Sequence, residues 1–200
     1  MIGLKEYFWV FEKAIPENIC DDIIKYGNSQ TLQQGLVGDF EKYGEHSEIR
    51  KSQVCFLDDR WVLDEIIPYV NTANKNAGWN FDLDWCESIQ YTNYESGEFY
   101  GWHSDDMTSA YGEKHHPNYK GKIRKLSVTI NLTDPSEYVG GEFEMDLRNN
   151  TEGRNIINID QVKPKGSILV FPSFVTHQVT PVRKGKRTSL VLWNLGPPWR

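Results

Sequence analysis

The sequence predicts a mainly β protein, a double-stranded β-helix (jelly roll) supported by α-helices at its N-terminal end. Apolar residues recur at helical spacing within residues 1–80, whereas residues 85–195 contain short β-type runs separated by turn residues. A single domain is expected over residues 1–200, because 38% hydrophobic and 25% charged residues suit one core. Residues 1–80 would form the helical support region and residues 85–195 the jelly-roll core.

Two helices are expected in the support region. The first begins at Glu17, directly after a proline, and Gly27 is expected to end it. Its apolar positions, at i, i+4 and i+7, are Ile19, Ile23 and Tyr26. The second begins near Asp58, and Pro68 lies inside it, so this helix is either kinked or shorter than its pattern. The apolar face of the second helix contains Val62, Ile66 and Val70. Residues 35–47, between the helices, are predicted to be a surface loop.

Eight short strands are predicted after residue 85. They are residues 85–94, 102–105, 125–132, 142–147, 156–162, 167–171, 175–180 and 188–193. Residues 126–132 alternate strictly between apolar and polar side chains, so the apolar face is expected to pack on the helices. The polar face, formed by Ser127, Thr129 and Asn131, either lines a cavity or faces solvent, and the pattern favours neither. Turns are expected at residues 140–141 and 164–166.

Charge and cysteine content argue against several classes of protein. The net charge of -6 is unfavourable for nonspecific binding to nucleic acid or to an anionic membrane. The three cysteines form no C-x-x-C pair, which indicates reduced thiols. The N-terminus lacks a basic region followed by an apolar run, and no segment approaches the length of a membrane span. We therefore expect a cytoplasmic protein without nucleic-acid or membrane partners.

The C-terminal segment is locally positive. Residues 161–200 contain several Lys and Arg residues but no Asp or Glu. Most of these charges are expected to be solvated loop charges. One or two could instead face a dianionic ligand.

Two histidines and one aspartate form the main chemical motif. His103 and Asp105 are one residue apart, so on a strand their side chains point the same way and can hold one metal. His177 lies far downstream and has to come from a neighbouring strand. A 2-His-1-carboxylate set is typical of non-haem Fe(II) and leaves positions open for a bidentate co-substrate and dioxygen. His-x-Asp alone is a weak signal, and the surrounding motifs strengthen it.

Several ordered motifs accompany these residues. They are residues 94–100 leading into 103–105, residues 124–128, the turn at 140–143, residues 164–166 before Phe171, and His177 before Pro181. Together they resemble the 2-oxoglutarate and Fe(II)-dependent oxygenases, in particular the prolyl 4-hydroxylase-like branch, over about residues 85–195. The resemblance implies that His103, Asp105 and His177 are the catalytic iron ligands.

The resemblance also implies a binding site for 2-oxoglutarate. Arg187 follows His177 at the position where the family has a basic residue that pairs with the distal carboxylate, and Ser189 can add a hydrogen bond. Tyr94 resembles a cavity tyrosine that also reaches the co-substrate. From the residues alone, Arg187 could face solvent and Tyr94 could be a core aromatic. Lys186 is the rival anchor, although its parity on the strand differs from that of Ser189.

The implied activity is that of a dioxygenase that uses Fe(II), 2-oxoglutarate and O2, with ascorbate as a further cofactor to test. It hydroxylates a C–H bond and releases succinate and CO2. A peptidyl proline in a peptide or protein is the favoured substrate, with a small molecule as the alternative. Asp105 favours hydroxylation over halogenation, because related halogenases lack that carboxylate. A cupin-like metal-binding module or a non-redox metalloenzyme is the alternative function, and a zinc hydrolase ranks last.

Residues 106–122 form the longest polar loop and directly follow the first two ligands. We predict that this loop is a mobile lid over the primary substrate, because few apolar residues would hold it down. A loop without function is the alternative. His115 and His116 lie in it, and His46 has no partner at ligand spacing, so none of the three is expected to bind metal.

Overall fold

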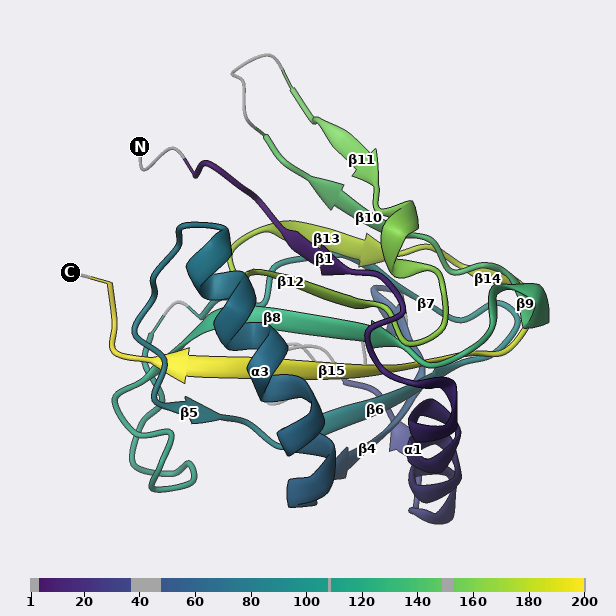
Figure 1. Ribbon diagram of the computed structural model, residues 1–200, viewed down its shortest axis with the longest axis horizontal. Helices are drawn as coiled ribbons and strands as arrows, with labels where there is room; N and C mark the ends of the chain where they lie inside the picture. The colour runs from purple at the N-terminus through teal and green to yellow at the C-terminus, as the bar shows by residue number, and fades with distance from the viewer. Residues whose placement is uncertain (1–3, 37–47, 108, 149–152, 200) are drawn as a thin grey trace.

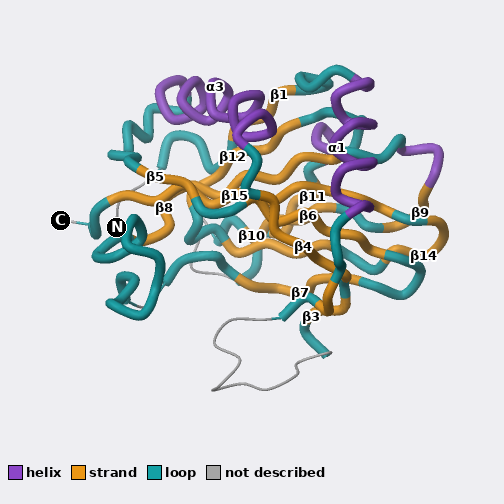
Figure 2. Tube along the Cα trace, turned by 90° about the horizontal axis from the view of Figure 1, so that it is seen from below, coloured by secondary structure: helices purple, strands orange, loops and turns teal. Residues whose placement is uncertain are grey.

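The computed structural model describes residues 4–36, 48–107, 109–148 and 153–199. In these residues the chain folds into three layers, which Figures 1 and 2 show from two directions. Helices α1 (Glu17–Ser29) and α3 (Arg60–Asn76) cover one face of a large sheet, and a smaller sheet lies against its other face. Two facing sheets of antiparallel strands confirm the predicted jelly roll with supporting helices.

The large sheet forms the centre of the molecule. In order across the sheet, its strands are β1 (Trp9–Phe11), β12 (Ile168–Pro172), β8 (Ile123–Asn131), β15 (Arg187–Gly196), β6 (Ile89–Tyr94), β4 (Gln53–Leu57) and β2 (Gln33–Gln34), and β5 (Trp85–Cys86) pairs with β15. The apolar face of β8 packs with α1 and α3 in one hydrophobic core. The polar face of β8 is also buried: Ser127 and Asn131 are 0% exposed and Thr129 is 4% exposed. The solvent-facing alternative for these three side chains is therefore wrong.

The smaller sheet carries a protruding hairpin. Its strands, in order, are β11 (Ile156–Asn158), β10 (Phe143–Asp146), β13 (Thr176–Val179), β7 (Phe99–His103) and β3 (Arg50–Lys51). The hairpin of β10 and β11 extends beyond the body of the molecule in Figure 1. Strands β9 (Tyr138–Gly140) and β14 (Val182–Gly185) form a separate two-stranded ladder.

The second helix begins at Arg60, close to the predicted start near Asp58. The predicted face of α3, formed by Val62, Ile66 and Val70, is fully buried against the large sheet. The helix continues through Pro68 to Asn76, so of the two alternatives for this helix, kinked or shorter, the shorter one is wrong.

The prediction that Gly27 ends the first helix is wrong. It lies inside α1, and a Cβ atom at this position would come within 2.5 Å of the Tyr91 ring on β6. The glycine is present because the helix packs directly on an aromatic ring, which the sequence pattern cannot distinguish from a helix-ending glycine.

The sequence missed six short strands of the described chain: β1, β2, β3, β4, β9 and β14. Four of them lie in the support region, which therefore contributes to both sheets as well as supplying the helices. These strands have two to five residues, too few for a period-2 pattern, and their pairing partners decide their conformation. The predicted strand at 85–94 is interrupted between β5 and β6, and the predicted strand at 156–162 ends at Asn158, before a 3-10 helix over Asp160–Val162.

The loop at 106–122 is held by two tyrosines. The Tyr111 hydroxyl donates a hydrogen bond to Glu87 Oε1 at 2.8 Å, and the Ser88 N–H donates to the Tyr119 hydroxyl at 3.3 Å. The two tyrosine rings also contact each other, with centroids 5.4 Å apart. Polar contacts of Tyr111 and Tyr119 therefore tie the loop to residues 87–88, and its role as a lid stays a prediction. Thr108 in this loop, and residues 37–47 of the predicted surface loop with His46, lie outside the described residues.

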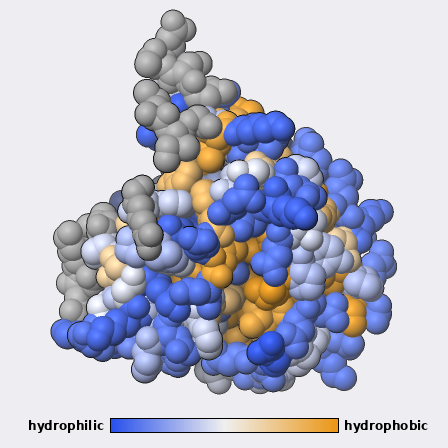
Figure 3. All heavy atoms as spheres, turned by 60° about the vertical axis from the view of Figure 1, so that its left-hand side comes forward, coloured by the Kyte–Doolittle hydropathy of each residue, from blue (hydrophilic) through white to orange (hydrophobic). Residues whose placement is uncertain are grey.

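Hydrophobic side chains also reach the surface. Figure 3 shows them gathered in a band across one face, bordered by hydrophilic residues. Phe174 and Trp199 are two large exposed hydrophobic residues whose rings contact each other, with centroids 6.1 Å apart. Among the helices of the described ranges, none is long and apolar enough to span a bilayer.

Candidate metal centre and adjoining cation pocket

His103 and His177 face each other across two paired strands. His103 is the last residue of β7, and the register of β7 with β13 places His177 directly opposite it. The ring centroids are 4.2 Å apart. The prediction that His177 lies on a strand next to that of His103 is confirmed.

Asp105 lies beyond the end of β7, not on the strand as predicted. Its backbone N–H donates to the Ser173 carbonyl at 2.9 Å, and the N–H of Asp106 donates to the same oxygen at 3.0 Å. This anchor beside the end of β12 directs the carboxylate to both imidazoles: Oδ1 lies 3.7 Å from His103 Nε2, and Oδ2 lies 3.6 Å from His177 Nε2. One ligand atom from each of the three residues falls within 4.8 Å of the others.

Backbone carbonyls orient both imidazole rings. His103 Nδ1 lies 2.8 Å from the Gly101 carbonyl oxygen, and His177 Nδ1 lies 2.9 Å from the Val175 carbonyl oxygen. A carbonyl oxygen only accepts hydrogen bonds, so each Nδ1 carries the proton and each Nε2 presents its lone pair toward Asp105. Two imidazole nitrogens and one carboxylate that lie this close together fit a divalent iron.

The protonation of the site also fits a cation. Burial, and secondarily the neighbouring His177, lower the pKa of His103 from 6.5 to about 3. Burial alone would raise the pKa of Asp105, but His177, His103 and Arg124 outweigh it, so the pKa of this carboxyl is lowered. At neutral pH the site therefore offers an uncharged His103 and an ionised Asp105.

Aromatic rings that the sequence analysis did not assign to the site hold the histidines in place. Tyr100 stacks on His103 with ring centroids 3.5 Å apart, and Phe143 stacks on His177 at 5.4 Å. Phe171 meets His177 edge-on at 4.7 Å. Phe143 and Phe171 are present in the motifs quoted above, but motif order does not reveal which ring they touch.

Arg187 opens β15 and lies opposite Tyr94 of β6. The residue is only 2% exposed, its Nη1 donates to Ser189 Oγ at 3.2 Å, and its Cζ lies 5.7 Å from the Tyr94 ring centroid. No carboxylate of the described ranges comes within ion-pair distance of the guanidinium. The solvent-facing alternative for Arg187 is therefore wrong.

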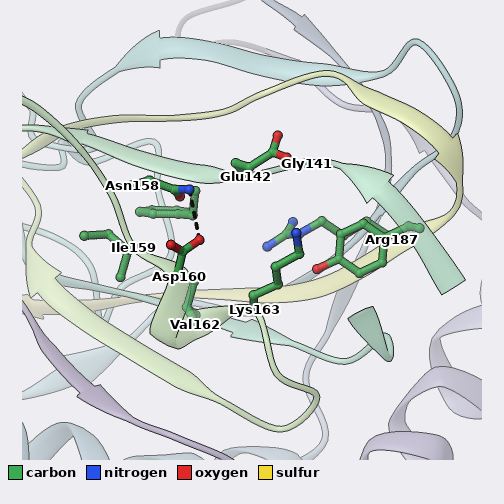
Figure 4. A pocket seen from close by; sticks show the side chains of 10 residues that line it. Gly141, Glu142, Asn158, Ile159, Asp160, Val162, Lys163 and Arg187 are labelled. Atoms are coloured by element: carbon green, nitrogen blue, oxygen red, sulfur yellow. Dashed lines mark hydrogen bonds between the residues drawn. The ribbon is translucent and has the colours of Figure 1, made fainter. Parts of the chain in front are cut away.

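One cavity connects the metal centre to the Arg187 neighbourhood. It is lined by all three metal-centre residues together with Tyr94, Ser189, Thr129, Trp193 and several apolar side chains. Arg187 contacts two of these lining residues, Tyr94 and Ser189, and itself lines a second pocket, drawn in Figure 4. Lys186 lines neither space. His115 and His116 lie instead in the turn of the 106–122 loop, where their rings contact Tyr111 and Tyr119.

Comparison with known proteins identifies the same part of the chain. Residues 89–194 match the model of the 2OG-Fe(II) oxygenase superfamily. A PKHD-type hydroxylase of Shewanella sp. (strain ANA-3) is 34% identical over 104 residues, which are 52% of this chain and 40% of the relative. The chain thus matches less than half the length of this curated relative.

Two solved structures share the fold over almost the whole chain. A viral collagen prolyl hydroxylase from Paramecium Bursaria Chlorella virus-1, in a 2OG complex, aligns with a TM-score of 0.65 and 18% identity, covering 96% of this chain and 97% of the other. A prolyl hydroxylase from Trichoplax adhaerens, in complex with a hypoxia inducible factor peptide fragment, aligns with a TM-score of 0.66 and 16% identity, covering 95% and 84%. At these identities the likeness concerns the fold alone.

Proposed function

The chain belongs to the 2OG-Fe(II) oxygenase superfamily, and from this premise we propose that it is an Fe(II)- and 2-oxoglutarate-dependent hydroxylase. One observation carries the proposal. A three-residue donor set for a divalent cation and a buried arginine without a carboxylate partner among the described residues adjoin the same cavity. A buried guanidinium is costly without an anion, so the cavity is suited to a ligand that bears a carboxylate at one end and binds metal at the other.

In this proposal His103, Asp105 and His177 hold Fe(II), which when bound supplies the chemistry of dioxygen activation and keto acid decarboxylation to succinate and CO2. Arg187 and Ser189 bind the distal carboxylate of 2-oxoglutarate. Burial raises the pKa of Tyr94, so its hydroxyl stays protonated and can donate a hydrogen bond to the co-substrate.

Apolar side chains form the remaining wall of the cavity. Phe143, Phe171, Val179 and Val191 line it, and all but Val191 are buried. Such a wall limits the entry of water, which protects the reaction from side reactions and strengthens the electrostatic contacts inside. This favours oxidation of a C–H bond over hydrolysis.

We further propose that the primary substrate is a peptidyl proline. Two fold relatives are prolyl hydroxylases, and one holds a peptide fragment. Phe174 directly follows Ser173, whose carbonyl anchors Asp105, and the exposed Phe174 ring contacts the exposed ring of Trp199, so apolar surface is available near the metal centre. A cytoplasmic enzyme is part of the proposal, because Cys20, Cys55 and Cys86 are free thiols.

Anaerobic reconstitution tests the core of the proposal. Adding Fe(II) and 2-oxoglutarate should produce the visible charge-transfer absorbance of a keto acid chelated to ferrous iron, and admitting O2 should release succinate. Neither signal would appear in a non-redox metalloenzyme or a zinc hydrolase. Proline-containing peptides should then gain the mass of one oxygen atom. If a small molecule is hydroxylated and the peptides are not, the hydroxylase activity stands and the proposal of a peptide substrate is wrong.

A further inference from the structure

The second pocket at Arg187 contains another cation. Figure 4 shows Lys163 and Arg187 pointing into this pocket from different elements. Lys163 directly follows the 3-10 helix at Asp160–Val162, whereas Arg187 begins β15. Two cationic side chains of the locally positive C-terminal segment, Lys163 and Arg187, thus line the same pocket.

The backbone of Lys163 is fixed on the interior of the large sheet. Its carbonyl accepts a hydrogen bond from the Asn131 side-chain amide, and its N–H donates to the Asp160 carbonyl at 3.0 Å. Asn131 is fully buried on β8. The half-buried Lys163 side chain therefore starts from a rigid position and is directed to the pocket by the fold.

The acids of the pocket have other partners. Glu142 accepts hydrogen bonds from the Thr180 hydroxyl and from Arg183 Nη2, the latter at 3.3 Å. Asp160 Oδ1 accepts a hydrogen bond from the Asn158 amide at 2.9 Å, the dashed line in Figure 4. Across the part of the chain that the structure describes, no carboxylate oxygen lies within 4.0 Å of the Lys163 ammonium or of the Arg187 guanidinium.

Two cationic side chains that line one pocket repel each other, and an anion bound between them would offset this repulsion. We propose that Lys163 is the second cation that binds the distal carboxylate of the co-substrate, together with Arg187, and thereby selects a dicarboxylic keto acid. This inference rests on the proposed function and adds a specificity-determining residue to it. Lys163 contributes charge, while the planar guanidinium of Arg187 orients the carboxylate.

The test is calorimetric titration of the Mn(II)-loaded protein with two keto acids, 2-oxoglutarate and 2-oxobutanoate, which lacks the distal carboxylate. Lys163→Gln should bind 2-oxoglutarate roughly 5- to 20-fold more weakly and 2-oxobutanoate with unchanged affinity. Lys163→Arg should restore most of the lost affinity. Lys165→Gln is the matched control, because Lys165 lies two residues away, pairs with Asp21 and does not line the pocket.

The outcomes separate the inference from the proposed function. If Lys163→Gln binds 2-oxoglutarate as tightly as the unaltered protein, the inference is overturned and the proposed function stands. A lower melting temperature with unchanged affinity also overturns it, because Lys163 would then serve only as a structural counter-charge for Glu142. If the unaltered Mn(II)-loaded protein binds neither keto acid, the proposed function itself fails.

Discussion

The metal centre and the Arg187 region are both buried, but their charges are arranged in opposite ways. At the metal centre, His103 and His177 each donate to a backbone carbonyl, and the Asp105 backbone is anchored at Ser173. In the Arg187 region, the arginine is 2% exposed, and its guanidinium donates a hydrogen bond to the Ser189 hydroxyl but, in the described ranges, has no carboxylate within ion-pair distance. The first region therefore suits a cation and the second suits an anion. Together they complement a dicarboxylate that binds a metal ion at one end and the arginine at the other.

Removing one of the three proposed metal ligands should have the largest effect and abolish activity completely. We expect His103→Ala, Asp105→Ala and His177→Ala each to abolish succinate release, because each variant lacks one donor of the 2-His-1-carboxylate set proposed to hold Fe(II). The variants should remain folded, since the hydrophobic core between the helices and the large sheet excludes these residues. Succinate release and circular dichroism measure the two effects. Normal turnover in any one variant would refute the assignment of that ligand.

Removing the guanidinium should break the other half. Truncating one member of a buried charge pair costs about 2 to 5 kcal/mol, so Arg187→Ala should weaken 2-oxoglutarate binding by roughly 30-fold to several thousand-fold. The metal affinity should stay unchanged, which distinguishes this variant from the ligand variants. Lys186→Ala is the control, because Lys186 precedes β15 and lines neither the cavity nor the pocket. Equal losses in the two variants would contradict the role of Arg187.

The two regions also differ in how far the sequence predicted them. The order of the motifs, through the family resemblance, was sufficient to predict that His103, His177, Arg187 and Ser189 lie close together, and strand pairing brings them around one cavity. The path of the backbone at Asp105 was not predictable, since it depends on the Ser173 carbonyl of another strand. Lys163 was predicted only as one of several positive residues, because nothing local indicates that a 3-10 helix turns it toward Arg187.

The same distinction applies to the fold. The alternation of β8 and the buried face of α3 were predicted correctly, because each has enough residues to display a period. The short strands β1 to β4 and the packing role of Gly27 depend on contacts with distant residues, among them Tyr91. Local patterns contain no information on those contacts.

The buried His103 should make the metal-free protein sensitive to mild acid. Its folded pKa is about 3 and its unfolded pKa about 6.5, so below about pH 6.5 the unfolded state binds a proton that the folded state does not. Stability should therefore fall by about 2 kcal/mol from pH 7 to pH 5 through this residue. The lowered pKa of Asp105 also stabilises the folded state, but this contribution is lost only as the pH falls below about 4, the ordinary pKa of a carboxyl. Asp105 therefore does not change the stability between pH 7 and pH 5.

Denaturant unfolding in the presence of a chelator measures this effect. His103→Gln should lose about 2 kcal/mol less between pH 7 and pH 5 than the unaltered protein does. His115→Gln, at an exposed loop histidine, should behave like the unaltered protein. Identical pH profiles for all three proteins would show that the metal centre admits protons freely, against the burial described above.

The last prediction concerns the space that Arg187 needs. Gly141 has a φ of +63°, and a Cβ atom there would lie 2.9 Å from Arg187 Cδ. Gly141→Ala should therefore push the guanidinium out of line and weaken 2-oxoglutarate binding about tenfold, with a stability loss of about 1 to 2 kcal/mol from backbone strain. Gly78→Ala is the matched control, because Gly78 has a φ of +73° with nothing within 4 Å of the added Cβ. It should lose similar stability from the backbone and keep its affinity. Calorimetric titration of both Mn(II)-loaded variants with 2-oxoglutarate separates the loss of affinity from the loss of stability. Equal affinities in the two variants would mean that the position of the Arg187 side chain does not determine co-substrate binding.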